Sequence, residues 1–585
     1  MVIFAICFPF IAGAVIARAE KSSKMQSNLV LYSALLEILA GLALAVVFFA
    51  GGSKDIDLFL ETRIIDIIMI LGELFLMGLI SFMAWKHKKF FVIPLTVIPT
   101  LAISWLELFA TPKMNLIETS HIHVDRLSVL MVLIVVIVGG LINIYATGYM
   151  KGYHHHHPEI KDRTNFFLPL LMVFLGAMSG LVLSASLIWL CFFWEVTSTI
   201  SFLLIGYTQT KEAETNSFRA IWMNLLGGMA IVAAVFISVY KCGTYDLFKM
   251  LGSDPAAIQF ILALLGFAAL TKSAQMPFSG WLIGAMCAPT PSSALLHSAT
   301  MVKAGIYLLI RLAPAMSGTV AGKMVAYVGG FTFLVASMLA ISSTDAKKVL
   351  AYSTVSNLGL MTACCGIGTM ETVFGAIMLM IFHAVSKSML FQAVGAVENS
   401  LGSREIGDWN GLIKRLPKLA VVIIIGILGM YTAPFGMLIS KYVAFQAFVD
   451  SGSIILVLLV AFGSATTMFY WTKFLATVFS MRVRKPVEDR TLKGEYISLY
   501  IHAALVILIC ALLAVVVNRF VDPMVDAMFA TDFTMLTTKD FGIMVCLLIF
   551  TFAIPFIAYF LTKNLPEKGS RHIWPVSIPV TEMNS

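Results

Sequence analysis

Seven ionisable side chains lie within long apolar stretches of the sequence or at their ends. Five of them carry a formal charge at neutral pH: Glu195, Lys272, Lys303, Lys387 and Lys441. Two histidines, His297 and His383, lie at similar depth. A charged residue at the centre of a bilayer costs about 2.5–3.5 kcal/mol on insertion scales, so the five together oppose insertion by about 12–18 kcal/mol. Charges retained at such a cost predict a function inside the membrane, such as the transfer of protons or other cations.

Glu195 and Lys272 are the pair best suited to such a transfer. Burial disfavours a lysine cation, whereas a carboxylate beside it favours the charged form. A Lys272 that gains and loses Glu195 as a partner could therefore take up and release a proton near neutral pH. The alternative is a permanent ion pair that only joins two helices.

The remaining five groups could continue the same path. His297 and Lys303 are six residues apart, which on one uninterrupted helix means about 9 Å along the axis and different faces. His383 and Lys387 are four residues apart and share a helix face. With Lys441 they suggest a row of proton-carrying groups bridged by water, rather than one metal site. A simple polar seam between helices is the alternative for His383 and Lys387.

The sequence predicts neither a metal nor a cofactor in this chain. Its eight cysteines form no CxxC pair, so neither an iron–sulfur cluster nor a zinc site is indicated. The adjacent Cys364 and Cys365 are interpreted as packing residues. The run His154–His157 resembles a metal-binding tract, but it lies among charged residues and is interpreted as a solvated loop. Asp345 and Lys347, in STDAKK, are interpreted as a helix cap and a topology signal.

The elements that must position these groups are membrane-spanning helices. The chain has 585 residues, 59% hydrophobic and 12% charged, whereas a soluble domain has about 25% charged residues. This composition excludes a soluble enzyme, a disordered chain, a collagen-like fibre and a small disulfide-rich domain. The formal net charge of +8 lies in short loops between apolar runs, so it indicates membrane topology and not nucleic-acid binding. The predicted fold class is an all-α polytopic membrane protein.

Apolar windows of about 20 residues predict seventeen membrane-spanning helices. The first starts at the N-terminus without a basic leader or an evident cleavage site, and we expect it to be retained. The predicted spans are 2–18, 28–50, 64–84, 90–111, 124–149, 166–184, 186–206, 219–240, 256–286, 291–312, 324–342, 347–367, 371–397, 418–448, 452–479, 497–517 and 539–562.

Lysine and arginine are unequally distributed between alternate loops. Loops after odd-numbered spans, together with the C-terminal tail, hold about 25 of them, and the other loops hold about eight. The excess predicts that the first set of loops lies in the cytoplasm. We therefore expect a multi-pass protein of the cell membrane with its N-terminus outside and its C-terminus in the cytoplasm.

Two of the predicted spans, 256–286 and 418–448, are long and carry Pro277 and Pro434 near the middle. An interior proline removes a backbone hydrogen bond and clashes with the preceding turn, so both helices are expected to be interrupted. Interrupted helices at corresponding positions of two halves are typical of transporters with inverted repeats. Two unrelated proline kinks are the alternative.

The chain is accordingly predicted to have three parts. Residues 1–122 form about four N-terminal transmembrane helices, and 481–585 form C-terminal helices and a cytoplasmic tail. Between them, 123–480 form a core with two five-helix repeats at about 166–312 and 324–479. The N-terminal helices carry three more glutamates, for which pairing with partner helices and facing the bundle both stay open: Glu37, Glu73 and Glu107.

The quoted residues lie in motifs that resemble the antiporter-like subunits of respiratory complex I, a family shared with multisubunit sodium/proton antiporters and energy-converting membrane-bound nickel–iron hydrogenases. The match runs from about His123 to Phe479, and its most specific part is 271–305. Its motifs are HVDRLSVL, INIYATGYM, FWEVTS, TKSAQMPFSGWL, APTPSSALLHSATMVKAG, STDAKKVLAYSTVSNLG, FHAVSKSMLFQAVG and the SK of APFGMLISK.

The resemblance implies a fourteen-helix core of two inverted repeats with a hydrated polar axis. It also implies that Glu195 gates Lys272, and that protons reach the terminal Lys441 through the groups between: His297, Lys303, His383 and Lys387. The chain departs from the family pattern in two respects. Four helices rather than two are predicted ahead of HVDRLSVL, and no long amphipathic helix is evident in the C-terminal part, where the segment 480–496 is short and basic.

The leading functional hypothesis is a subunit that translocates protons, or protons and sodium, in a complex I-related redox complex. The stretch SFRAIWMNLLGGMAI at 217–231 resembles the large subunits of energy-converting hydrogenases, and this resemblance favours a hydrogenase-type complex over an NADH–quinone oxidoreductase. The expected partners are other membrane subunits, the lipid bilayer and a peripheral cytoplasmic redox arm. Iron–sulfur clusters, a nickel–iron centre or flavin are expected only in those partner subunits, and no redox active site in this chain.

Two alternatives use the same residues. The first is a subunit of a multisubunit sodium/proton antiporter without redox chemistry, which the ionisable groups alone do not distinguish from the leading hypothesis. The second is a structural membrane scaffold with inert ion pairs.

Overall fold

The computed structural model describes residues 1–531, apart from 22, 61–62, 112–113, 115, 118–119, 432–435 and 481–485, together with a few isolated positions further on. The chain divides into two compact units, Met1–Met535 and Leu536–Ser585. The predicted span 539–562 belongs to the second unit, and nearly all of it lies outside the described residues. All seven ionisable groups of the predicted path belong to the first unit.

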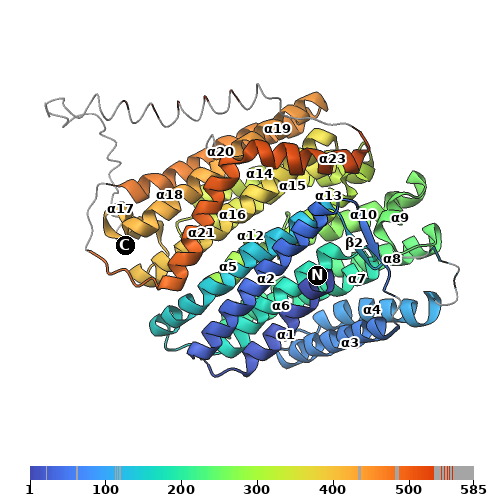
Figure 1. Ribbon diagram of the computed structural model, residues 1–585, viewed down its shortest axis with the longest axis horizontal. Coiled ribbons are helices and arrows are strands. Elements are labelled where there is room, and N and C mark those ends of the chain that lie inside the picture. The colour runs from blue at the N-terminus through green and yellow to red at the C-terminus, as the bar shows by residue number, and fades with distance from the viewer. Residues whose placement is uncertain are drawn as a thin grey trace, which may run out of the picture. The chain divides into compact units, whose positions relative to one another are not determined.

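The first unit is a bundle of helices with one small sheet (Figure 1). Among the described residues, fourteen helices are long and apolar enough to cross a membrane, and two shorter ones, Val2–Arg18 and Pro417–Tyr431, are also apolar. This confirms the all-α polytopic fold.

The first half of the chain contributes α1 (Val2–Arg18), α2 (Lys24–Ala50), α3 (Arg63–Lys86), α4 (Val92–Trp105), α5 (Arg126–His156), α6 (Thr164–Leu183), α7 (Leu187–Ile205), α8 (Lys211–Cys242), α9 (Leu247–Leu251), α10 (Pro255–Lys272), α11 (Gly280–Gly284) and α12 (Thr290–Ser298). The second half contributes α13 (Met301–Met316), α14 (Val320–Ser342), α15 (Ala346–Ile367), α16 (Met370–Leu401), α17 (Leu412–Arg415), α18 (Pro417–Tyr431), α19 (Gly436–Asp450), α20 (Ile454–Phe479), α21 (Lys493–Ala511), α22 (Leu513–Val516) and α23 (Asp522–Phe529). The sheet pairs β1 (Ile56–Leu58) antiparallel with β2 (Ile122–Val124).

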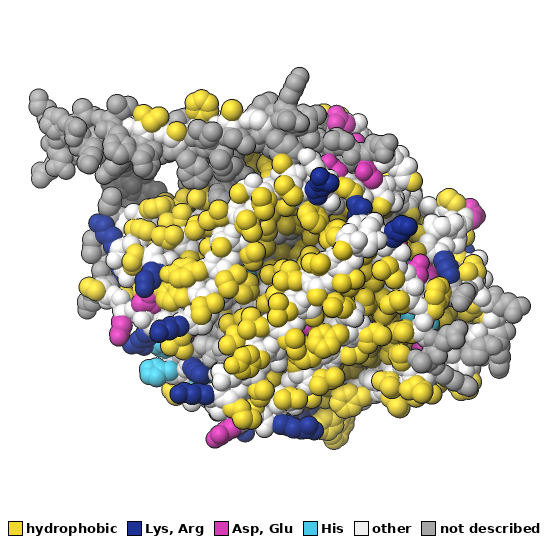
Figure 2. All heavy atoms as spheres, in the orientation of Figure 1, with side chains coloured by type: hydrophobic (Ala, Val, Ile, Leu, Met, Phe, Trp, Pro, Cys, Tyr) yellow, Lys and Arg dark blue, Asp and Glu magenta, His cyan; other side chains and the backbone are white. Residues whose placement is uncertain are grey.

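The visible surface of the bundle is mostly hydrophobic. Figure 2 shows hydrophobic side chains covering the middle of the helices, with most of the charged side chains near the helix ends. Large apolar residues are exposed on outer helices, for example Leu39 on α2, Phe75 on α3 and Phe462 on α20. Such a surface suits contact with lipid, while many polar and charged side chains lie inside.

Two sets of five helices follow one another in the same order. The first consists of α6, α7, α8, the α10–α11 segment and the α12–α13 segment, and the second of α14, α15, α16, the α18–α19 segment and α20. An odd number of crossings makes the second set enter the membrane from the opposite face. The four helices α1–α4 precede α5, as the sequence predicts, and pack on α6, α5, α7 and α8.

The fourth helix of the first set is interrupted around Pro277. Helix α10 ends at Lys272 and α11 begins at Gly280. The indole Nε1 of Trp281 donates a hydrogen bond to the carbonyl of Thr271 (3.0 Å) across the interruption. Because unpaired backbone groups are costly in a bilayer, this bond stabilises the break.

The corresponding position of the second set lies between α18, which ends at Tyr431, and α19, which begins at Gly436. Pro434 belongs to residues 432–435, which are outside the described residues.

The predicted span 291–312 was expected to be one continuous helix, and this expectation is wrong. Helix α12 ends at Ser298 and α13 begins at Met301, with Thr300 in a non-helical conformation (φ −120°, ψ −108°) between them. The hydroxyl of Thr300 donates to the carbonyl of Leu295 (2.7 Å). A threonine side chain that bonds to a nearby backbone carbonyl competes with regular helical hydrogen bonding, which accounts for the break.

Helices α14 and α15 approach each other at backbone distance. A Cβ atom at Gly359 would lie 2.6 Å from the backbone nitrogen of Phe333, and one at Gly329 would lie 2.5 Å from that of Ala363. Only glycine therefore fits at these two positions, because a Cβ atom would clash with the backbone of the facing helix.

Replacing Gly359 with valine should force α14 and α15 apart and destabilise the protein by about 1–3 kcal/mol. The measurement is thermal unfolding of the purified protein in detergent. Gly78→Val on α3 is the matched control, because nothing lies within 4 Å of a Cβ built at Gly78. Equal unfolding temperatures for the two variants would contradict the close approach.

Candidate functional site

Lys272, the last residue of α10, is fully buried against α7. Its Nζ donates hydrogen bonds to the Trp194 carbonyl (2.9 Å) and the Ser198 hydroxyl (2.7 Å), and lies 4.7 Å from the centre of the Trp194 ring. Glu195 follows Trp194, and its charge interacts with that of Lys272. The structure records no ion pair within 4.0 Å between these two described residues. Lys272 is thus held by neutral groups next to Glu195.

The carboxylate of Glu195 occupies space left by a glycine on α8. A Cβ atom at Gly228 would collide with Oε1 of Glu195. Gly228 therefore belongs to the site, although the sequence analysis did not select it. The signal that could have found it is the Gly-Gly pair at 227–228 in an otherwise bulky helix.

The other five predicted groups converge around His383 of α16. Electrostatic interactions connect His383 with Lys303, Lys387, His297 and Lys441. All five side chains are buried, and neither ring nitrogen of His383 has a hydrogen-bond partner among the described residues. Buried polar atoms normally have partners in the protein or in ordered water. The structure therefore brings these five predicted residues together.

The three lysines of this cluster are held by neutral groups. Lys387 donates to the carbonyl of Leu350 (3.1 Å) and to the hydroxyl of Ser353. The Nζ of Lys303 lies 3.7 Å from the sulfur of Met361. Lys441 lies beside a cavity of about 290 Å³. Within the described chain, none of the three lysines has a carboxylate at ion-pair distance.

The Glu195–Lys272 pair and the cluster around His383 meet where α13 packs against the end of α10. A Cβ atom at Gly305 would lie 2.6 Å from the carbonyl of Ala269 and 2.9 Å from the nitrogen of Ser273. Lys303 and Lys272, close in sequence to these contacts, therefore lie on neighbouring helix ends. No direct bond between the two described lysines is recorded, so proton transfer between them would need water.

The expectation for the STDAKK segment is right for Asp345 and wrong for Lys347. Asp345 caps α15, because its carboxylate accepts a hydrogen bond from the backbone N–H of Lys348 (3.1 Å). Lys347 is fully buried, and its Nζ lies 3.0 Å from Oε2 of Glu398, which also pairs with Arg404. The partners are about fifty residues from Lys347 in sequence, so no local pattern indicates the pairing.

The run at 154–157 is not a loop, because His154 and the two residues after it form the last turn of α5. His154 is hydrogen-bonded to the hydroxyl of Tyr207 (2.9 Å) and lies 3.4 Å from Asp162. Over the described part of the chain, no group of three or more His, Cys, Asp or Glu side chains could hold a metal ion.

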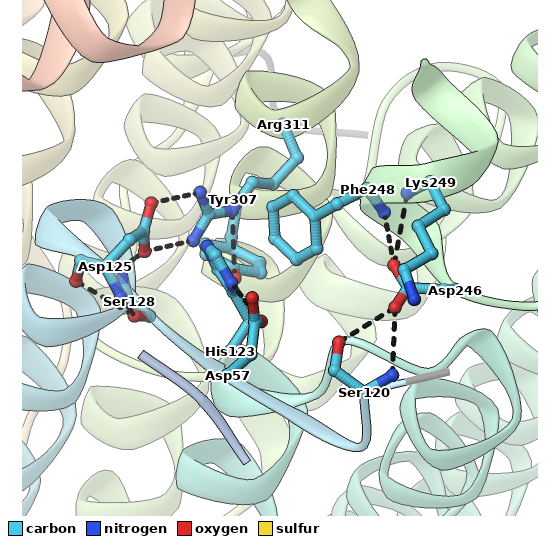
Figure 3. A network of polar contacts seen from close by, with 10 residues as sticks. All are labelled: Asp57, Ser120, His123, Asp125, Ser128, Asp246, Phe248, Lys249, Tyr307 and Arg311. Atoms are coloured by element: carbon cyan, nitrogen blue, oxygen red, sulfur yellow. Dashed lines mark hydrogen bonds and ion pairs between the residues drawn. The ribbon is translucent and has the colours of Figure 1, made fainter. Parts of the chain in front are cut away.

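A buried ion pair between Asp125 and Arg311 joins the start of α5 to α13 (Figure 3). The two terminal nitrogens of the guanidinium, Nη1 and Nη2, donate to the carboxylate at 2.5 and 2.6 Å, and Nε donates to the hydroxyl of Tyr307 (3.1 Å). Asp125 also caps α5 through the backbone N–H of Ser128 (2.9 Å). Lys303 lies two turns before Arg311 on α13, so the pair fixes the helix that carries Lys303.

Burial of Asp125 disfavours its charge, but the charge and hydrogen bonds of Arg311 outweigh burial and hold its pKa well below the ordinary value. A depressed pKa means that the pair stabilises the fold above the unfolded-state pKa of about 3.9. The contribution is therefore present at neutral pH and is lost as the pH falls below that value.

Replacing Asp125 with asparagine should lower the free energy of unfolding by about 3–5 kcal/mol, because it leaves the Arg311 cation buried without a partner. Thermal unfolding at neutral pH measures this loss. The double variant Asp125→Asn, Arg311→Met is the control and should be more stable than Asp125→Asn alone. A single variant as stable as the wild type would show that the ion pair is not a brace.

The fold defines an all-α polytopic membrane protein with ionisable groups buried between its helices, and comparisons with known proteins identify its family. A family model described as "NADH:quinone oxidoreductase/Mrp antiporter, TM" matches residues 184–467. A second, for the N-terminus of complex I chain 5, matches 118–160. The chain belongs to the antiporter-like membrane-subunit family shared by complex I and Mrp antiporters.

Two curated relatives are named as subunits of Na(+)/H(+) antiporters. The one from Staphylococcus haemolyticus is 31% identical over 437 residues, covering 67% of this chain and 53% of the relative. The one from Alkalihalophilus pseudofirmus is 33% identical over 399 residues, covering 64% of this chain and 48% of the relative. The chain thus spans about half the length of these relatives.

Two solved structures share the fold. The Mrp complex from Dietzia sp. matches with a TM-score of 0.63 and 25% identity, covering 86% of this chain and 57% of the matched chain. The membrane-bound sulfane sulfur reductase, an archaeal respiratory membrane complex, matches with a TM-score of 0.71 and 20% identity, covering 90% of this chain and 97% of the matched chain. The second likeness shows the fold alone. The names of the relatives favour the antiporter alternative over the redox hypothesis.

Proposed function

We propose that this chain is an ion-translocating subunit of a multisubunit cation/proton antiporter complex in the cell membrane. The observation that carries ion translocation is the convergence of buried ionisable groups on His383, with no described carboxylate at ion-pair distance from Lys303, Lys387 or Lys441. Two relatives named as Na(+)/H(+) antiporter subunits support it. Other membrane subunits would be its partners, and the loop charges favour an N-terminus outside and a C-terminus in the cytoplasm.

Protons would move because buried like charges repel one another. Lys303, Lys387 and Lys441 interact with His383, so the arrival of a proton at one group lowers the proton affinity of its neighbours. Separated groups of this kind need water between them to exchange protons.

Glu195 and Lys272 would act as the gate of this row. In the conformation of the structure, Lys272 is bonded to Ser198 and to the Trp194 carbonyl. Movement of its ammonium toward Glu195 would stabilise the protonated form of Lys272. Return to the neutral partners would favour release of the proton.

Lys272→Ala should lower cation-driven proton transport by about 100-fold or more, since a positioned proton carrier typically contributes that much. Transport is measured as the pH change in inside-out membrane vesicles that contain the assembled complex. Lys323→Ala is the matched control, because Lys323 is an exposed lysine on the outer helix α14. Normal transport by an intact Lys272→Ala complex would overturn the proposed function.

A membrane subunit of a redox complex is the second candidate. The observation that favours it is the family model over residues 184–467, whose description names NADH:quinone oxidoreductase beside the Mrp antiporter. In this case, clusters or flavin would reside in partner subunits.

Purification of the native complex distinguishes the two candidates. The proposed function predicts that only other membrane subunits co-purify, as identified by mass spectrometry. Co-purification of iron–sulfur or hydrogenase subunits in equal amounts would support the redox candidate instead.

A further inference from the structure

Glu73 on α3 is a buried carboxylate that the proposed row does not use. Its side chain is 5% exposed, and Oε2 has no hydrogen-bond partner among the described residues. Helix α3 packs on α7, and a Cβ atom at Gly72 would lie 2.9 Å from the ring of Phe192. Since Phe192 is three residues before Glu195, Glu73 lies at the level of the gate.

Electrostatic interactions connect Glu73 with two other carboxylates, Glu195 on α7 and Glu107 just after α4. Cys191 interacts with Glu73, Glu195 and Lys272, which places all four groups in one neighbourhood. Glu73 is therefore close enough to interact both with the gate and with Glu107.

Glu107 lines a cavity of about 580 Å³ at the end of the bundle where α3 and α7 begin. Asp66 lines it too and interacts with Glu107. Asp66 and Glu73 are seven residues apart, two turns along the same face of α3. The wall also contains His121, which interacts with Asp66 and Asp246.

Glu195 and Glu73 lie at similar depths in the bundle. Glu195 lies eight residues after the start of α7, about 12 Å along the axis, and Glu73 lies ten residues after the start of α3, about 15 Å. Asp66 is within one turn of that end. Glu73 and Glu195 thus both lie deeper in the bundle than Asp66 at the cavity.

Carboxylates in such surroundings cannot all stay ionised. The described residues of the cavity wall include no lysine or arginine, and the interactions recorded for Glu73 and Glu107 are with other acids. Like charges at short distance and an apolar environment both favour the protonated form of at least one group. A chain of carboxyl groups that share protons can pass them on.

We propose that α3 and α4 form a proton side path from the cavity at Asp66 and Glu107, through Glu73, to Glu195. The path gives the gate access to the membrane face at which α3 begins, the face predicted to lie outside. The inference rests on the proposed function, because it supplies protons to the same gate. It concerns the N-terminal part of the chain, where four helices precede α5 and the family resemblance implies two.

The first test replaces Glu73 with glutamine in the full chain, assembled with its partner subunits in inside-out vesicles. We expect a several-fold fall in proton transport, with recovery in Glu73→Asp, which keeps a carboxyl group. Glu37→Gln is the matched control, because Glu37 is also a fully buried glutamate with unpartnered oxygens, on α2, and no interaction with Glu195 is recorded for it. Equal transport in Glu73→Gln and Glu37→Gln complexes would overturn the side path.

The second test does not depend on transport. Dicyclohexylcarbodiimide reacts with protonated carboxyl groups in apolar surroundings, and peptide mass spectrometry locates the adduct. We expect modification of Glu73 in the wild-type complex at neutral pH, and a decrease as the pH is raised. No modification of Glu73 at any pH, or its prevention by sodium ions at constant pH, would overturn a proton path.

Failure of the side path and failure of the proposed function give different results. If Lys272→Ala abolishes transport while Glu73→Gln transports like Glu37→Gln, the proposed function stands and the side path is wrong. If Lys272→Ala transports normally, the proposed function is wrong, and the side path with it.

Discussion

Buried positive charges that repel one another are the constraint from which the architecture of this protein can be understood. Lys303, Lys387 and Lys441 lie in the interior with His383 among them, and the groups that contact the lysines are carbonyl, hydroxyl, thioether and aromatic. In a low-dielectric interior, charges of one sign cannot all be present together without a large cost. Such a cluster is stable only if some of its members are neutral, and protons can then be exchanged among them.

The rest of the bundle keeps this cluster in a defined geometry. The interruption after Lys272 places an ammonium group at a helix end, where it reaches the carbonyl of Trp194. The ion pair between Asp125 and Arg311 fixes α13, while contact between glycine backbones fixes α14 against α15. The bracing pair thus joins opposite charges, whereas Lys303, Lys387 and Lys441 have no described carboxylate at ion-pair distance, which is the distribution expected if the first is structural and the second exchange protons.

The sequence predicts the described spans and the placement of ionisable groups inside the bundle, because long apolar runs and the cost of charge within them are local properties. It does not predict the break between α12 and α13, which depends on a hydrogen bond from Thr300 to Leu295 that hydropathy does not reveal. Neither the burial of Lys347 nor the space that Gly228 provides for Glu195 could be predicted, since both depend on contacts between helices far apart in sequence.

The central claim is that water connects the buried groups into one path, and high-resolution electron cryomicroscopy of the native complex in lipid nanodiscs tests it most directly. The account predicts ordered water between Lys272 and Lys303, and onward around His383 to Lys441. Density showing tightly packed apolar side chains in those gaps, with His383 lacking any hydrogen-bond partner, would contradict it.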